Sequence, residues 1–143
     1  MSDTLKTALE KFGGADSLND IINTHWHANH TQDNRTLGGK ASIVAHDNVR
    51  TRLLSSQKMK LFKMVSEIYP IEAVPSIAYS QKMTLHIDSE TIEIVHFLND
   101  HTGGDSVIFF RNANVVHTGG HFFSGFFPFV DIIDNLMSLL RFS

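Results

Sequence analysis

The chain has 143 residues, which is enough for one domain with a moderate core, and we expect a single domain over residues 1–143. Its content of 42% hydrophobic and 19% charged residues is typical of a folded, water-soluble protein and excludes a disordered one. A net charge of −3 without a basic block argues against a nucleic-acid partner, and the absence of cysteine excludes disulfides and thiolate metal ligands.

The beginning of the chain, Met1 to Gly14, is a polar and charged helical pattern without the apolar core of a signal peptide. No apolar run in the sequence reaches the length that a membrane-spanning helix needs. We therefore expect a cytoplasmic protein with no membrane partner.

The N-terminal half alternates between helical and extended patterns. Two short apolar strands separated by a helical segment predict a parallel strand–helix–strand unit. The apolar residues near the middle of the chain have mixed spacing, and we interpret them as a helix. In chain order, the predicted elements are a helix from Thr4 to Phe12, a strand from Asp20 to Thr24, a helix from about His30 to Leu37, a strand from Ala41 to His46, a helix from Asp47 to Leu54, and a helix over residues 57–69.

The C-terminal half changes to a period of two, which is the pattern of strands with one buried face. Two β-hairpins are expected, and a helix with one apolar face follows them. These elements are a hairpin with strands at 83–87 and 91–95, a hairpin with strands at 106–110 and 115–118, and a helix from Asp131 to Arg141.

Three histidines lie within six positions directly after the first predicted strand: His25, His27 and His30. Neutral imidazole is the commonest protein ligand for zinc, and side chains this close at the end of a strand can converge on one ion. Two later turns also combine histidine with glycine, at residues 101–105 and 117–121. A metal centre is therefore the leading functional hypothesis.

The run from Ile22 to Thr31 resembles the His-x-His-x-Asp-His signature of the metallo-β-lactamase superfamily, with Asn29 at the position of the aspartate. The segment around His101 is similar to the turn that carries the family's third histidine. Val115 to Gly120 resembles the strand and turn that end in Gly-Asp, with Gly120 in place of the bridging aspartate. The motifs occur in the family's order, and the resemblance is closest to the hydrolase-like members.

The resemblance implies an α/β fold, namely a partial metallo-β-lactamase-like αββα sandwich that lacks the N-terminal strands and the C-terminal end. The first sheet would then keep about two parallel strands, 20–24 and 41–46. An open sheet edge and the apolar surfaces of segments 59–68 and 122–129 would invite self-association. We therefore expect a homodimer or a higher homo-oligomer.

The resemblance also implies a ligand set for the metal. His25, His27 and His101 would bind one zinc ion and leave the fourth position to a water molecule, whose pKa the ion lowers toward about 7. At the second metal position only His30 remains, because the amide of Asn29 is neutral and Gly120 has no side chain. We expect one zinc ion per chain, or none.

Several residues have two interpretations. His121 is either a substitute ligand or a side chain that points away from the site. Asp105 either orients a ligand histidine or caps the turn before the strand at 106–110. The phenylalanine cluster, Phe122, Phe123, Phe126, Phe127 and Phe129, either lines an apolar pocket or belongs to the core or an interface. We expect His117 to be a hydrogen-bonded core residue, and we expect structural or surface roles for His46, His86 and His96.

The function implied by the resemblance is a degenerate zinc-dependent hydrolase with weak or no activity on an ester, lactone or thioester bond of a small molecule. Its catalytic residues beyond the zinc-bound water are unknown, because Asn29 and Gly120 replace the aspartates. An asparagine cannot take up a proton at neutral pH, whereas an aspartate can. The alternatives are a non-catalytic binding or interaction module, and a gene remnant that retains the fold.

Overall fold

The computed structural model describes residues 3–59, 64–98, 101–122 and 124–125. The helix expected at 131–141 and four phenylalanines of the cluster, Phe123, Phe126, Phe127 and Phe129, lie outside these residues. The helical elements are α1 (Asp3–Glu10), η1 (Ala15–Ser17), α2 (Ala28–Thr31), α3 (Asn34–Leu37), α4 (Asp47–Leu53) and η2 (Ile71–Ala73). The strands are β1 (Asp20–Ile22), β2 (Ser42–His46), β3 (Gln57–Met59), β4 (Met64–Ser66), β5 (Ile77–Tyr79), β6 (Lys82–Ile87), β7 (Glu90–His96), β8 (Ser106–Phe110) and β9 (Val115–His117).

The first sheet is parallel, with the strand order β1-β2-β5. This confirms the predicted parallel unit, although the single helix expected between its strands is two short helices, α2 and α3. The expectation of about two strands is wrong, because β5 adds a third. Strand β5 has no clear signal in the sequence, since three residues that closely follow Pro75 are too few for a recognisable alternation.

The second sheet is antiparallel, with the strand order β6-β7-β8-β9. Both predicted hairpins are confirmed, with Leu85 opposite Ile92 in the first and Phe109 opposite Val116 in the second. The alternating pattern of β6 places Met83, Leu85 and Ile87 on the face that packs against the core.

The segment 57–69, expected to be helical, contains an antiparallel hairpin instead. Strand β3 pairs with β4 in the register that places Gln57 opposite Ser66. Apolar residues at mixed spacing do not form the continuous stripe by which a helix buries one face. Val65 and Ile68 are accordingly 61% and 58% exposed, and neither is buried as a residue on the packed face of a helix would be.

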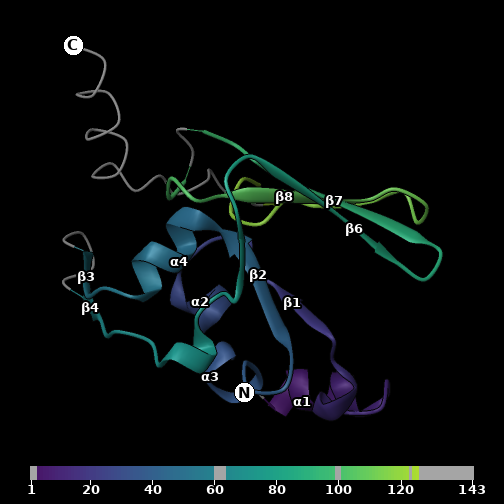
Figure 1. Ribbon diagram of the computed structural model, residues 1–143, viewed down its shortest axis with the longest axis horizontal. Helices are drawn as coiled ribbons and strands as arrows, with labels where there is room; N and C mark the ends of the chain where they lie inside the picture. Colours follow the sequence, from purple (N-terminus) through teal and green to yellow (C-terminus); the bar gives the residue numbers. More distant parts are fainter. Residues whose placement is uncertain (1–2, 60–63, 99–100, 123, 126–143) are drawn as a thin grey trace.

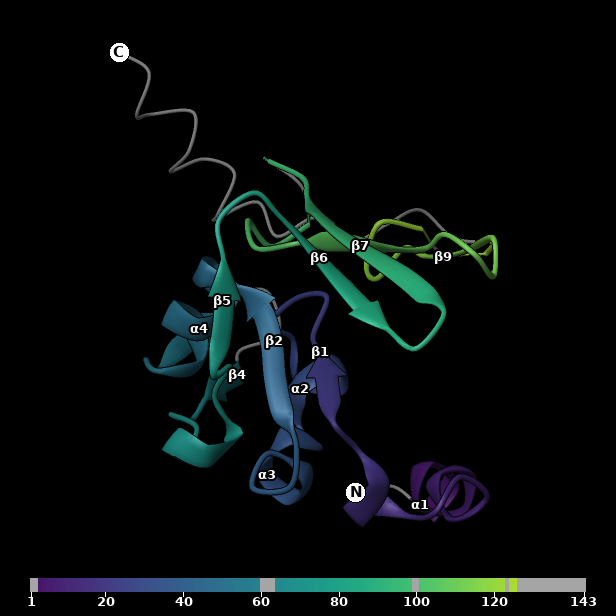
Figure 2. The ribbon, with the colours of Figure 1, turned by 45° about the vertical axis from the view of Figure 1, so that its right-hand side comes forward.

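Helices α2 and α4 lie on one side of the parallel sheet and the antiparallel sheet lies on the other (Figures 1 and 2). An apolar cluster fills the space on each side. Val49 and Leu53 of α4 pack with Trp26 and Ala45 on one side. On the other side, Val44 and Tyr79 pack against residues of the antiparallel sheet, which include Ile94. The described residues thus form a helix layer, a parallel sheet and an antiparallel sheet, and none of their helices has both the length and the apolarity needed to cross a bilayer.

The two sheets are joined by hydrogen bonds beside the histidine loop. The Tyr79 hydroxyl donates to Ser106 Oγ at 2.6 Å, and the Ser106 backbone N–H donates to the Thr24 carbonyl at 2.9 Å. Ser106 and Thr24 are buried. These bonds hold the end of β1 against the start of β8, and each strand has candidate metal ligands next to it.

Candidate metal centre

His25 and His27 lie in the loop that follows β1, and buried side chains on both sides hold this loop. The amides of Asn23 and Asn34 bond to each other, and the Asn23 amide also donates to the His30 carbonyl at 3.2 Å. The Thr31 hydroxyl donates to the carbonyl of His27 at 3.1 Å. The loop therefore has a fixed path before any ion binds.

His101 belongs to the turn between β7 and β8. Both carboxylate oxygens of Asp105 bind Thr102, one through its backbone N–H and one through its hydroxyl. The Asn48 side chain of α4 donates to the Gly103 carbonyl at 2.5 Å. Of the two interpretations of Asp105, the turn cap is the one that these contacts support, and the cap fixes the position of His101.

The imidazoles of His25, His27 and His101 meet at one point. One ring nitrogen of each residue lies within 4.8 Å of one from each of the other two, and His101 Nε2 lies 3.1 Å from His27 Nδ1. Two nitrogens bound tetrahedrally at 2.0–2.1 Å would be about 3.3 Å apart. His25 and His101 are buried and His27 is half-buried. This arrangement can hold a metal ion with little movement of the side chains.

The surroundings of His25 and His30 favour the neutral state of both rings. Burial, followed by the neighbouring imidazoles of His30, His27 and His101, lowers the pKa of His25 from its usual 6.5 to about 2. Burial is also the main reason why the pKa of His30 is lowered. A neutral imidazole has a lone pair, so these rings need not lose a proton before one of them binds a metal.

Gly120 is buried directly against the imidazoles. A Cβ atom at this position would lie 2.5 Å from Cδ2 of His101 and 3.2 Å from Cε1 of His25. A heavy-atom contact of 2.5 Å is far inside van der Waals distance, so a side chain here would displace the His101 ring. The space that the resemblance assigns to the side chain of the bridging aspartate is therefore occupied by the ring of His101, a candidate ligand.

The other residues of the predicted second position do not join the group of three. The ring of His30 contacts that of His25 at a tilt of 47°, with centroids 4.0 Å apart, and Asn29 is exposed on α2. The ring of His121 contacts Phe97 with a centroid distance of 5.6 Å. Phe122, the one member of the phenylalanine cluster within the described residues, is 68% exposed and is not a core residue.

Of the remaining histidines, one has surroundings that differ from those expected. His117 is exposed, so the expectation of a core residue is wrong, although its Nδ1 accepts a hydrogen bond from the Gly119 backbone N–H. Among the described residues β9 lies at the edge of its sheet, and its three residues are exposed. His86 is exposed on β6. His46 and His96 stack with centroids 3.7 Å apart and bond to backbone groups, which is the structural role expected of them.

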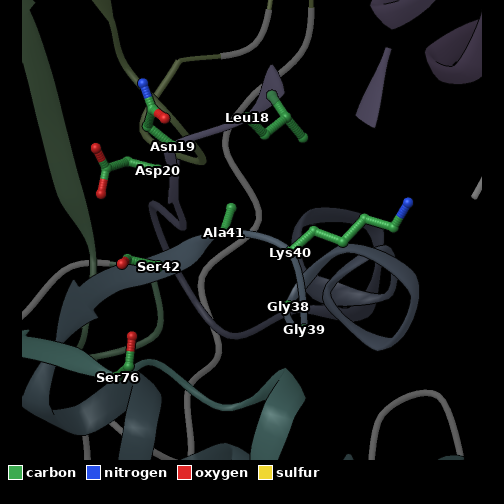
Figure 3. Close-up of a pocket in the computed structure, with 9 residues that line it drawn as sticks. All are labelled: Leu18, Asn19, Asp20, Gly38, Gly39, Lys40, Ala41, Ser42 and Ser76. Carbon is green, nitrogen blue, oxygen red and sulfur yellow. The ribbon is translucent and has the colours of Figure 1, made fainter. Parts of the chain in front are cut away.

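A shallow pocket of about 570 Å³ lies at the other end of β1 and β2, where these strands begin (Figure 3). Its lining includes Asp20, Ser42 and Ser76 but no histidine. Lys40 at its rim is paired with Asp16 at 2.5 Å. The pocket is therefore separate from the histidine cluster, which follows the other end of β1.

Neither a protein-family model nor a curated relative matches the chain in sequence. A metallo-β-lactamase with the HARLDQ motif from Cronobacter sakazakii has a similar structure, with a TM-score of 0.54 and 15% identity over 73% of this chain and 42% of its own. MEM-A1, a subclass B3 metallo-β-lactamase from a soil metagenome library, has a TM-score of 0.60 and 14% identity over 96% of this chain and 59% of its own. The chain has the metallo-β-lactamase fold.

A third structure agrees with this result. The metallo-β-lactamase MIM-1 from Novosphingobium pentaromativorans has a TM-score of 0.55 and 14% identity over 94% of this chain and 55% of its own. The chain thus spans about half the length of the metallo-β-lactamase structures that it matches. The expected α/β class and metallo-β-lactamase-like fold are confirmed.

One residue beside the candidate metal centre was not predicted from the sequence. Thr24, expected only as the last residue of a strand, has its hydroxyl 3.1 Å from Nδ1 of His25. A hydroxyl residue directly before a ligand-type histidine at a strand end was the available signal. Its meaning depends on how the backbone turns there, which a strand pattern alone does not predict.

Proposed function

We propose that this chain is a metal-binding protein of the metallo-hydrolase type, with one zinc ion on His25, His27 and His101. The observation that supports it is the convergence of three ring nitrogens within 4.8 Å, two of the three residues being buried. Imidazole nitrogens suit zinc, and catalytic zinc sites commonly use three protein ligands.

We further propose that any hydrolase activity is weak, on an ester, lactone or thioester bond of a small molecule. A zinc ion in this position would polarise a carbonyl oxygen of such a substrate. Asn29 cannot accept a proton at neutral pH, and Gly120 has no side chain to do so. The chain therefore offers an electrophilic site without the carboxylate bases that the resemblance would place beside it.

The proposal includes only one ion. Two dications about 3.5 Å apart repel each other by about 19 kcal/mol at an effective dielectric constant near 20. Carboxylate ligands would offset this repulsion, but Asn29 is neutral and Gly120 packs against His101. That packing also supports the second candidate, a non-catalytic binding module that keeps the fold and one ion.

The metal content of the purified protein tests whether the chain binds one zinc ion, two ions or none. The purified protein, loaded with zinc and passed over a desalting column, should retain one zinc per chain by elemental analysis. A retained content near two, or none, would contradict the proposal. A screen of ester, lactone and thioester substrates then separates the two candidates, because the binding module shows no turnover above zinc-free protein.

Asn29→Asp offers a matched test of the missing carboxylate, since Asn29 is exposed and a side chain of the same size fits there. It should strengthen zinc binding by a few-fold, because a charge a few ångströms away contributes about 1 kcal/mol in a solvent-exposed setting. Asp33→Asn, outside the three histidines, provides the reverse charge change as a control. If Asn29→Asp binds zinc with the wild-type affinity, Asn29 is not part of the metal site.

We also propose that the chain forms a homodimer or a higher homo-oligomer. Exposed apolar side chains of β4 and the segment after it support self-association: Val65, Ile68 and Ile71 are 61%, 58% and 66% exposed. Light scattering coupled to size exclusion at micromolar concentration should give at least twice the monomer mass. A stable monomer would contradict this part of the proposal.

A further inference from the structure

Thr24 connects the elements that form the metal centre. It follows β1, is 3% exposed, and its carbonyl accepts the Ser106 backbone N–H of β8. Its side chain also packs under the turn at Gly119, where a Cβ atom would lie 2.8 Å from Thr24 Cβ. This one residue therefore contacts the strand end before His25, the start of β8 and the turn that covers the imidazoles.

The Thr24 hydroxyl approaches two imidazoles. Its Oγ1 lies 3.1 Å from Nδ1 of His25 and 3.5 Å from Nδ1 of His30. A hydroxyl group has a single proton to donate, although its oxygen can accept as well. The oxygen could accept from both rings, but the proton of this buried hydroxyl would then have no acceptor among the contacts that the structure describes for Thr24. We therefore assign one ring as the donor to Oγ1 and the other as the acceptor of its proton. The direction of these two bonds sets the tautomers of both histidines.

The role of His25 decides the direction. His25 belongs to the group of three that can hold an ion, whereas His30 does not. Because Nδ1 of His25 faces the Thr24 hydroxyl, Nε2 is the nitrogen left for an ion, and in a neutral ring Nε2 has a lone pair only when Nδ1 carries the proton. Oγ1 then accepts from His25 and donates to His30.

We propose that Thr24 is a positioning residue that fixes His25 as the Nδ1–H tautomer and His30 as the Nε2–H tautomer. His25 then presents a lone pair at Nε2 in advance of binding. His30 carries a proton on Nε2 and accepts at Nδ1, so neither of its nitrogens is available as a metal ligand. The inference rests on the proposed zinc site for its purpose, but the tautomers exist in the metal-free protein.

Long-range ¹H–¹⁵N NMR of metal-free protein labelled at histidine tests the proposal directly, since the two ring nitrogens of a neutral histidine have different shifts. The wild-type protein should show a protonated Nδ1 for His25 and a protonated Nε2 for His30. Resonances are assigned by His25→Gln and His30→Gln variants. A protonated Nε2 on His25, or a protonated Nδ1 on His30, would overturn the proposal.

Two variants separate the hydroxyl from the shape of the side chain. Thr24→Val keeps the volume and removes the hydroxyl, whereas Thr24→Ser keeps the hydroxyl. Competition with a chromophoric chelator should show zinc binding about 10- to 100-fold weaker in Thr24→Val, which is the usual effect of losing a group that orients a ligand histidine. Thr24→Ser should bind zinc within about threefold of the wild type.

Chemical denaturation and circular dichroism show whether Thr24→Val is folded. If it is not, the wild-type and Thr24→Ser spectra still decide the tautomers. Equal zinc affinity in folded Thr24→Val and wild type would overturn the positioning role. Absence of zinc binding in the wild type would instead contradict the proposed function, and the tautomers of the metal-free protein would remain a separate result.

Discussion

Two groups of histidines in this chain use their ring nitrogens differently. In the candidate metal centre, one ring nitrogen each of His25, His27 and His101 lies within 4.8 Å of those of the other two. In the stacked pair, His46 Nε2 bonds the Ser80 carbonyl, and His96 Nδ1 bonds the Asp105 carbonyl. Nitrogens that converge on one point suit an ion, whereas nitrogens that bond to backbone groups hold loops together. Proximity of histidines alone therefore does not indicate a metal centre.

The largest expected effect comes from removing a member of the converging group. His101→Ala should lower zinc affinity by more than about 100-fold, because the loss of a residue that merely orients a ligand already costs 10- to 100-fold. Isothermal titration calorimetry provides the measurement. His86→Ala, at an exposed position on β6, is the control and should bind zinc like the wild type. Equal affinity in His101→Ala would remove His101 from the ligand set.

The stacked pair should respond in stability and not in metal binding. His46 is buried, and its Nδ1 accepts the Asn48 backbone N–H at the start of α4. His46→Ala loses this cap and leaves the Ser80 carbonyl without its partner, which together should cost about 2–4 kcal/mol in the free energy of unfolding. Urea denaturation gives the value. A zinc affinity that falls as steeply as in His101→Ala would break the distinction between the two groups.

Gly120 tests how closely the converging group is packed. Gly120→Ala places a Cβ atom 2.5 Å from His101 Cδ2, so the ring must move. We expect a loss of about 1–3 kcal/mol in stability and a measurable loss of zinc affinity. Gly39→Ala is the matched control, because a Cβ at Gly39 would meet no atom within 4 Å. If Gly120→Ala and Gly39→Ala behave alike, the cluster is looser than the structure indicates.

The smallest expected effect is a pH dependence carried by His46. Burial, and then the adjacent His96 ring, lower the pKa of His46, and the Ser80 carbonyl, Asp47 and Asp105 oppose this shift. Above the unfolded-state pKa near 6.5, the ring is neutral in both states and its contribution is complete. Below it, the unfolded chain binds a proton that the folded chain resists, so stability falls until the pH reaches the lowered pKa.

The measurement compares wild type with His46→Gln in urea denaturation at several pH values from 7 to 5. One such group contributes at most about 1.4 kcal/mol per pH unit, and His46→Gln should lose less stability than the wild type over this range. Parallel curves for wild type and His46→Gln would show that His46 does not titrate differently in the two states.

The sequence predicted the elements whose pattern is local. The hairpins of the antiparallel sheet follow from a period of two, and the loop after β1 was recognisable from His25, His27 and their spacing. The hairpin of β3 and β4 was not predicted, because apolar residues at mixed spacing favour neither helix nor strand and tertiary contacts decide which one forms. The three-residue strand β5 was too short to recognise.

The sequence, with the resemblance, predicted which histidines come together but not the contacts that surround them. His101 lies 74 residues after His27 in the chain, and the resemblance was needed to join them. The exposure of His117 depends on β9 being an edge strand, which is a property of the sheet and not of its sequence. The bond between Thr24 and His25 likewise depends on the backbone turn that follows β1.

Trp26 is the only tryptophan of the chain, and it lies between the two candidate ligands of the loop. It is 3% exposed, and its indole contacts the His27 ring edge-on with centroids 4.9 Å apart. Indole fluorescence is sensitive to a charge placed this near, so we expect an ion on His27 to change the emission of the one tryptophan. The emission of Trp26 should therefore report metal binding to the histidine cluster in solution without an added label.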